Sequence, residues 1–237
     1  MYCKSPEGVP FLMKTPLTIA IDGPVGAGKS TISDVVAQHL GILHLDTGAM
    51  YRAVGLCALE NGVNPKDEAG VCALFADGKN QVDVRYENGR QTTLLGGRDV
   101  SGLIRTPKVG KAASDVSTLK NVRSMLVKRQ QELARQQPML LDGRDIGTVV
   151  LPDASVKIYL TASPEARARR RMLQLREAGQ PAEFEAILRQ VNERDAQDTG
   201  REHDPLRQAE DAFLVDSSAL TFDETVQAIL SLLEAHT

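Results

Sequence analysis

A short motif near the N-terminus constrains this chain more than any other feature. It fits the pattern G-x-x-x-x-G-K-[ST], with one more hydroxyl residue behind it, in the run Gly23-Pro24-Val25-Gly26-Ala27-Gly28-Lys29-Ser30-Thr31. The apolar run 17–22 before it predicts a buried parallel strand, and residues 30–40 carry apolar side chains at helical spacing. Such a turn lets the backbone wrap around a phosphate, toward which the helix directs free N–H groups. We therefore predict a phosphate-binding loop (P-loop), the alternative being a glycine-rich turn that binds nothing.

The residue types in this loop assign its chemistry. Lys29 is expected to bridge the β and γ phosphates of a nucleoside triphosphate, and the Ser30 hydroxyl is expected to bind Mg²⁺. Asp142 ends another predicted strand, residues 139–143, where its carboxylate would face Mg²⁺ through water. The alternative for Asp142 is an aspartate that begins the turn at Gly143. The chain has no Asn-Lys-x-Asp motif for guanine, so we expect ATP as the nucleotide.

The remaining periodicity predicts an α/β fold. Short apolar runs at 17–22, 42–45, 139–143, 156–160 and 213–216 read as strands, and helices are expected at 30–40, 49–61, 119–136 and after Thr221. Strands that alternate with helices form a parallel sheet, so we predict a P-loop parallel five-stranded sheet flanked by helices.

One region interrupts this alternation of strands and helices. Val82, Val84 and Tyr86 alternate with polar residues, Asn88-Gly89 supplies a turn, and residues 92–95 return as a second strand. The alternation gives the hairpin one wet face, so we place it in an appended subdomain over 74–114.

Two charged clusters are the next signal. Four arginines crowd one turn of a predicted helix, namely Arg167, Arg169, Arg170 and Arg171, and repel one another unless anions lie among them. They either cover an exposed face or belong to a mobile lid that clamps phosphates and excludes water. A second cluster has helical spacing and contains Arg194, Asp195, Asp198 and Arg201. The Arg194 and Asp198 pair fits a surface salt bridge as well as a site.

Composition excludes several other classes of protein. With 28 Lys and Arg against 31 Asp and Glu, the net charge is −3, which argues against nucleic acid as a partner. No apolar run approaches the roughly 20 residues that cross a bilayer, so we expect no membrane partner and a cytoplasmic location. The core looks self-sufficient, which favours a monomer.

Four segments together resemble the bacterial cytidylate kinases. They are the P-loop 23–31, Leu45-Asp46-Thr47-Gly48-Ala49-Met50-Tyr51-Arg52, Asp142-Gly143-Arg144-Asp145-Ile146-Gly147-Thr148, and the run Arg194-x-x-x-Asp198-x-x-Arg201. The resemblance covers residues 17–235. It implies transfer of the γ-phosphoryl group of ATP to CMP or dCMP, giving CDP or dCDP and ADP. Residues 1–16 show no periodicity, so we expect a flexible leader there, which is a departure from the family. The resemblance also implies a P-loop core at 17–73, 115–162 and 203–237, an acceptor-binding insert at 74–114 and a small helical lid at 163–202.

The resemblance further implies roles for single residues. Those around the acceptor's ribose and phosphate are Thr47, Tyr51, Arg52 and Arg144, and those facing cytosine are Ser114, Arg123 and Asp145. The residues expected to close over the ribose and phosphates are Arg194, Asp198 and Arg201. The nucleotide is held by residues 23–31 and Arg167, and the side chains expected to act on the transferring phosphoryl group are Lys29, Arg144, Arg170, Arg171 and Arg194. Val25 departs from the family, which has a smaller or hydroxylated residue there.

The acceptor phosphate is already an anionic nucleophile, so in-line transfer needs alignment and charge neutralisation but no general base. Two other functions fit the motifs. One is a P-loop kinase for uridylate or for a non-nucleotide alcohol. An alcohol acceptor would need a base to accept its proton. The other is a regulator that uses ATP or GTP as a switch and binds RNA or a protein through its basic helix.

Overall fold

A computed structural model describes residues 16–236, so the predicted leader lies outside the described residues except for Pro16. Within this range, no helix is long and apolar enough to cross a membrane. The strands are β1 (Thr18–Asp22), β2 (Leu43–Asp46), β3 (Val82–Glu87), β4 (Arg90–Leu95), β5 (Arg98–Asp99), β6 (Met139–Gly143), β7 (Val156–Thr161) and β8 (Phe213–Asp216). The helices are α1 (Lys29–Leu40), α2 (Thr47–Glu60), α3 (Glu68–Ala73), α4 (Pro107–Val116), α5 (Lys120–Ala134), α6 (Pro164–Glu177), α7 (Phe184–Thr199) and α8 (Phe222–His236), with short helical turns η1 (Leu103–Arg105) and η2 (Ile146–Val150).

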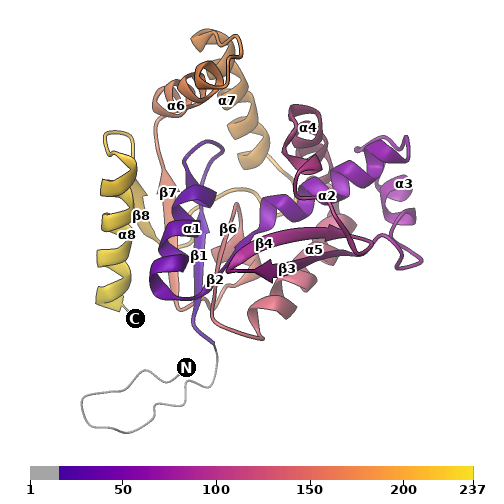
Figure 1. The fold of residues 1–237 in the computed structure, drawn as a ribbon, viewed down its shortest axis with the longest axis horizontal. Coiled ribbons are helices and arrows are strands. Elements are labelled where there is room, and N and C mark those ends of the chain that lie inside the picture. Colours follow the sequence, from indigo (N-terminus) through magenta and orange to yellow (C-terminus); the bar gives the residue numbers. More distant parts are fainter. Residues whose placement is uncertain (1–15, 237) are drawn as a thin grey trace, which may run out of the picture.

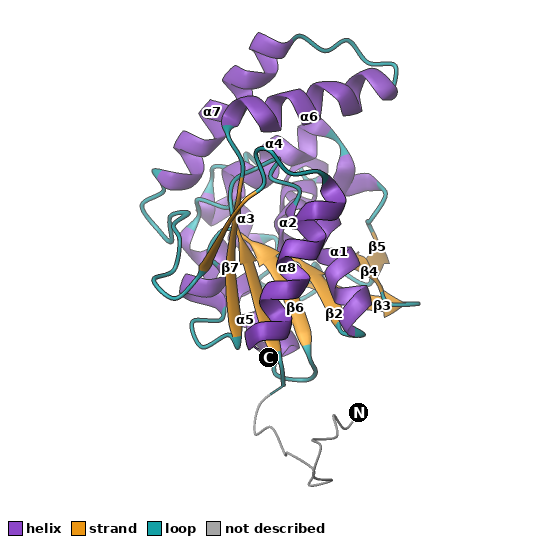
Figure 2. Cartoon of the chain, turned by 90° about the vertical axis from the view of Figure 1, so that its left-hand side faces the viewer, coloured by secondary structure: helices purple, strands orange, loops and turns teal. Residues whose placement is uncertain are grey.

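Five strands form a parallel sheet in the order β2-β6-β1-β7-β8, which confirms the predicted fold class. Successive side chains of a strand face opposite sides. Ile19 and Ile21 accordingly pack with α1 and α8, whereas Ala20 packs with α2 and α5 on the other face. Figures 1 and 2 show these two layers of helices around the sheet.

Local chemistry explains where the elements begin and end. A Cβ atom at Gly23 would lie 1.9 Å from the Leu160 carbonyl oxygen, so only glycine allows the chain to leave β1 at this point. Helix α2 begins at Thr47, two residues earlier than predicted. The Asp46 carboxylate accepts a hydrogen bond from the Ala49 N–H (3.0 Å) and caps the helix at that position.

The predicted hairpin is β3 and β4, with Asn88 and Gly89 at positive φ in the turn. The two-residue strand β5 was not predicted. Residue 114 falls inside α4, which packs so closely on α2 that a Cβ at Gly55 would lie 2.8 Å from the Ala113 nitrogen. We use "acceptor insert" for residues 74–114 and "lid region" for residues 163–202.

The lid region consists of α6 and α7, which stand above the carboxyl edge of the sheet (Figures 1 and 2). Its buried apolar residues Ala168, Ile187 and Val191 form a small cluster of their own, separate from the clusters on the two faces of the sheet. The lid region therefore has no share in the main core.

Candidate active site

A cleft of about 860 Å³ opens at the carboxyl edge of the sheet, between the P-loop, the acceptor insert and the lid region. Every residue expected around the acceptor lines it: Thr47, Tyr51, Arg52, Ser114, Arg123, Arg144, Asp145, Arg194, Asp198 and Arg201. Its lining holds eleven Lys and Arg against five Asp and Glu, although the whole chain is acidic. The cleft is therefore suited to a polyanion such as a nucleotide.

The P-loop forms one wall of the cleft through Val25, Gly26, Gly28, Lys29, Ser30 and Thr31, while Gly23, Pro24 and Ala27 do not line it. The buried Lys29 ammonium donates to the carbonyl oxygens of Gly23 (2.8 Å) and Pro24 (2.9 Å). Burial, aided by the nearby Arg144 charge, lowers the pKa of Lys29 to about 7. Phosphate oxygens are better partners for this cation than carbonyl oxygens, because they carry charge.

Asp142 lies behind the P-loop and is buried. Its Oδ2 accepts from the Ser30 hydroxyl (2.9 Å), and its Oδ1 faces the His44 Nε2 (2.7 Å). The side chain therefore serves the P-loop rather than the turn that follows it. Ser30 and Asp142 supply hydroxyl and carboxylate oxygens, which are the ligands that Mg²⁺ takes.

Among residues 16–236, no group of three or more His, Cys, Asp or Glu side chains is arranged to hold a metal ion alone. Magnesium usually binds through one or two protein oxygens and the phosphates of a nucleotide. The Ser30 and Asp142 pair fits that pattern.

His44 is a feature that the sequence reasoning missed. Its Nδ1 faces the Asp34 carboxylate on α1, and its Nε2 faces Asp142 on β6. Burial alone would lower the pKa of His44, but the hydrogen bonds to Asp142 and Asp34 outweigh it and raise the pKa to about 10. No local pattern could reveal this, because the two partners lie 10 and 98 residues away along the chain.

Asp22 was also missed. Its buried carboxylate accepts from the Ile146 and Gly147 N–H groups, both at 2.7 Å. Burial raises the pKa of Asp22 to about 6, against the lowering effect of these two bonds. Asp22 thereby ties the strand before the P-loop to the segment after Arg144 and Asp145.

A second group of charges joins the lid region to the sheet. Arg144 Nε donates to Asp198 Oδ2 (2.7 Å), and Arg194 Nε lies 3.4 Å from Asp198 Oδ1. Asp198 is only 1% exposed, so its contact with Arg194 is not a surface salt bridge. Burial would raise the pKa of Asp198, but the two guanidinium groups outweigh it and lower the pKa below its usual value.

The three residues expected at cytosine all line the cleft. The buried Arg123 donates to Asp145 through Nη2 and to Asp204 through Nε (2.7 Å). The Ser114 hydroxyl donates to Gln197 Oε1 on α7 (2.6 Å). Asp204 and Gln197 were not anticipated, because neither belongs to a motif.

Arg201 lies close to these residues and also lines the cleft. Its Nη2 donates to the Asp204 carbonyl (2.8 Å), while its buried Nε has no hydrogen-bond acceptor among residues 16–236. A buried donor without a partner costs free energy until an acceptor arrives. Because Arg201 lines the cleft, an anionic ligand there would be a suitable partner for its guanidinium group.

The lid arginines differ from one another. Arg170 donates to the Ser217 hydroxyl (3.2 Å) and to the Ser217 and Leu220 carbonyls, whereas the exposed Arg171 makes one long contact with Gln174 (3.5 Å). Both line the cleft. Their expected action on the transferring phosphoryl group stays a prediction.

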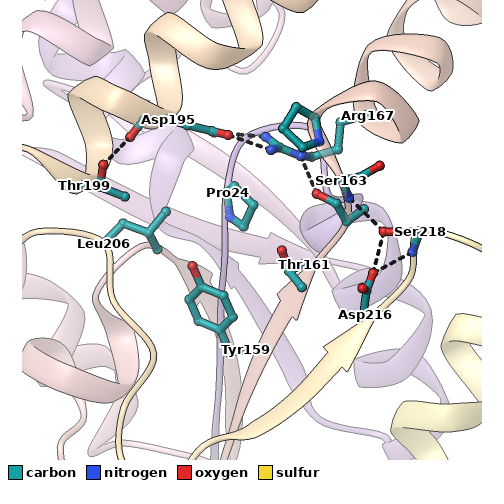
Figure 3. A pocket seen from close by; sticks show the side chains of 12 residues that line it. Pro24, Tyr159, Thr161, Ser163, Arg167, Asp195, Thr199, Leu206, Asp216 and Ser218 are labelled. Atoms are coloured by element: carbon teal, nitrogen blue, oxygen red, sulfur yellow. Dashed lines mark hydrogen bonds and ion pairs between the residues drawn. The ribbon is translucent and has the colours of Figure 1, made fainter.

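Arg167 is held by protein groups (Figure 3). It forms a two-point pair with Asp195 on α7 (2.9 and 2.6 Å) and donates to the carbonyls of Ala162 and Val25. Val25 thus contributes a carbonyl oxygen that anchors the P-loop to the lid region. A smaller pocket of about 350 Å³ adjoins this pair, between Tyr159, Thr161 and Leu206.

Comparisons with known proteins agree with this geometry. A family model for cytidylate kinase matches residues 19–235. The chain is 48% identical to the cytidylate kinase of Caldicellulosiruptor bescii, over 91% of this chain and 95% of that protein. It is 47% identical to the cytidylate kinase of Desulforamulus reducens, over 91% and 96%. Among solved structures, an uncharacterized protein from Eubacterium ventriosum superposes with a TM-score of 0.50 at 11% identity, covering 92% of this chain and 98% of that one, which bears on the fold alone.

Proposed function

The chain belongs to the cytidylate kinase family, and we propose that it transfers the γ-phosphoryl group of ATP to CMP in the cleft described above, giving CDP and ADP. dCMP is proposed as a second acceptor, giving dCDP. The observation that carries the proposal is the convergence on one cleft of a P-loop and the family's expected acceptor residues. The P-loop lies on one wall, and Arg144, Arg194 and Arg201, which also line the cleft, are proposed to bind a second phosphate.

The proposed transfer depends on alignment and charge. An acceptor phosphate attacks as an anion, so no side chain has to remove a proton. The arginines of the cleft would hold the donor and acceptor phosphates in line and neutralise the equatorial oxygens of the transferring group. Arg170 and Arg171 would join them as the lid region closes and excludes water.

We further propose Mg²⁺ as the metal, held by the Ser30 hydroxyl and, through water, by Asp142. Their separation of 2.9 Å and their oxygen chemistry support this assignment. When bound, the ion would neutralise the β and γ phosphates of ATP.

We propose that the enzyme distinguishes cytosine from uracil by hydrogen bonds to charged side chains. Cytosine presents a donating amine beside accepting N3 and O2, whereas uracil presents an accepting O4 and a donating N3. A carboxylate only accepts and a guanidinium only donates, so Asp145 would face the amine and Arg123, with Ser114, would face N3 and O2. The ion pair between Asp145 and Arg123 supports this proposal, because it keeps an acceptor and a donor side by side.

The direct test is to incubate the protein with ATP, Mg²⁺ and each nucleoside monophosphate, and to measure diphosphate formation. We expect CMP and dCMP to react and UMP to react about a hundredfold more slowly. Equal rates for CMP and UMP, or no diphosphate from either, would contradict the proposal.

Asp145→Asn tests base reading. An amide can donate to O4 of uracil, so CMP turnover should fall steeply and the ratio of kcat/KM for CMP over UMP should narrow by about tenfold or more. If Asp145 only holds Arg123 in place, both substrates lose the same factor and the ratio stays constant.

A further inference from the structure

Four side chains from three elements form a closed circuit behind the P-loop. Ser30 and Asp34 lie one turn apart on α1, where residues four apart share a face. Ser30 donates to Asp142 on β6, Asp142 faces His44 on β2, and His44 faces Asp34. The circuit thus returns to the helix on which it began.

His44 is the member of this circuit with two donors. Each of its ring nitrogens points at a carboxylate oxygen, and carboxylates only accept, so both nitrogens donate. The ring is only 6% exposed, and its backbone carbonyl accepts from the Tyr86 hydroxyl of the acceptor insert (3.0 Å). His44 is therefore held in place from the helix, the sheet and the insert.

His44 restricts the orientation of the Asp142 carboxylate. Its two carboxylate oxygens are held separately, Oδ1 by His44 and Oδ2 by Ser30. A carboxylate fixed at one oxygen can still turn about its Cβ–Cγ bond, whereas one fixed at both cannot. Without His44, a buried oxygen would also lose its partner.

We propose that His44 is a positioning residue that fixes the Asp142 carboxylate in the orientation in which it supports the metal–nucleotide complex at Ser30. This proposal rests on the proposed function only in requiring a nucleotide at the P-loop. His44 itself does not line the cleft, so it acts through Asp142 and not on the substrate.

The test compares nucleotide binding with and without metal. Calorimetry on the full chain measures the Kd of a non-hydrolysable ATP analogue in EDTA and in Mg²⁺ or Mn²⁺, and electron paramagnetic resonance follows the bound Mn²⁺. For His44→Leu we expect the gain in affinity from metal to fall about tenfold or more, while the Kd in EDTA changes less than about twofold. A merely structural role would weaken both arms alike.

Two further variants keep the test decisive. His44→Gln retains one donor toward Asp142 and should recover the metal-dependent gain to within about threefold of wild type. Asp34→Asn alters an exposed residue at the outer end of the circuit and should reduce the gain by a smaller factor, even if His44→Leu does not fold. His39→Leu, on the exposed end of α1, is the matched control and should change neither arm.

Equal weakening in both arms, no change in either, or a His44→Gln variant as poor as His44→Leu would overturn the proposal. A wild-type protein that binds the analogue but makes no CDP would instead contradict the proposed function, because the metal-dependent gain can be measured without turnover.

Discussion

The acceptor insert and the lid region reach the same cleft but are attached to the sheet by different forces. The insert buries Val82, Leu95, Val100 and Ile104 in the same apolar cluster as α2 and α5. The buried apolar residues of the lid region form a separate cluster. The lid region contacts the rest of the protein through charged and polar groups, such as the pairs Arg144–Asp198 and Arg167–Val25.

This difference in attachment predicts which of the two regions separates more easily from the sheet. Separating the insert would expose apolar surface at about 25 cal/mol per Å². Separating the lid region exchanges buried ion pairs for hydrated charges, and the hydration regained offsets much of the lost attraction. A ligand that brings its own phosphates can compensate for those lost pairs. We therefore expect the lid region to separate from the sheet more readily than the insert.

The largest expected effect separates the two regions by stability. Ile104→Ala should lower the free energy of unfolding by about 3 kcal/mol, because Ile104 is fully buried in the shared cluster. Ile187→Ala is the matched control in the lid region, and its urea midpoint should stay close to wild type because its cluster is separate from the main core. Equal losses of stability in urea titrations would break the comparison.

Ion pairs provide the converse test. Asp198→Asn removes the charge shared by Arg144 and Arg194 and should lower kcat/KM for CMP by about 30-fold, or about 2 kcal/mol. Glu60→Gln removes the exposed pair between α2 and Arg98 of the insert, and should change neither activity nor stability measurably. A large effect of Glu60→Gln on either quantity would show that charge attaches the insert as well.

Acid should loosen the lid region before the insert. The pKa of Asp198 lies below its usual value of 3.8, so its charge stabilises the attachment at every pH above that value, and the contribution is lost as the pH falls through the lowered pKa. In methyl NMR spectra, the Ile187 signal should shift below about pH 4 while the Ile104 signal stays constant. Asp198→Asn should lack this transition. A shift of both signals together would mean that the regions move as one.

The smallest effect concerns the bridge between the two regions. The Ser114 hydroxyl donates to Gln197, and the Gln197 amide donates back to the Ser114 carbonyl (3.3 Å). Because these bonds are neutral, Gln197→Ala should reduce kcat/KM for CMP by about fivefold at most. If Ser114→Ala costs clearly more in the same assay, the hydroxyl contacts the acceptor as well as Gln197.

The parts of the fold that follow a local period were predictable. Apolar runs located the five parallel strands, and Asn88-Gly89 located the hairpin turn, because both signals lie within a few neighbouring residues. Strand β5 has two residues and no such signal. The early start of α2 depends on the Asp46 side chain, whose capping role competes with its place at the end of β2.

The site was predictable where it coincides with a motif. The P-loop carries its own spacing, and the acceptor residues came from the resemblance to a family. His44, Asp22 and Asp204 stayed hidden because their partners are brought close only by the sheet and its crossovers. Arg167 and Arg171 are the same residue type in one predicted helix, so the sequence could not tell them apart. In the structure Arg167 donates to Asp195 and to backbone carbonyls, whereas Arg171 is exposed.

The position of β1 at the centre of the sheet bears on how the protein is made. Its two neighbours are β6 and β7, which begin at Met139 and Val156, so the chain at least as far as β6 must leave the ribosome before β1 can pair on either side. Until then the nascent chain carries an apolar strand with two open edges, the feature through which unfinished chains aggregate. The arrangement that places the strand before the P-loop at the centre of the sheet thus makes the pairing of that strand wait for β6 and β7.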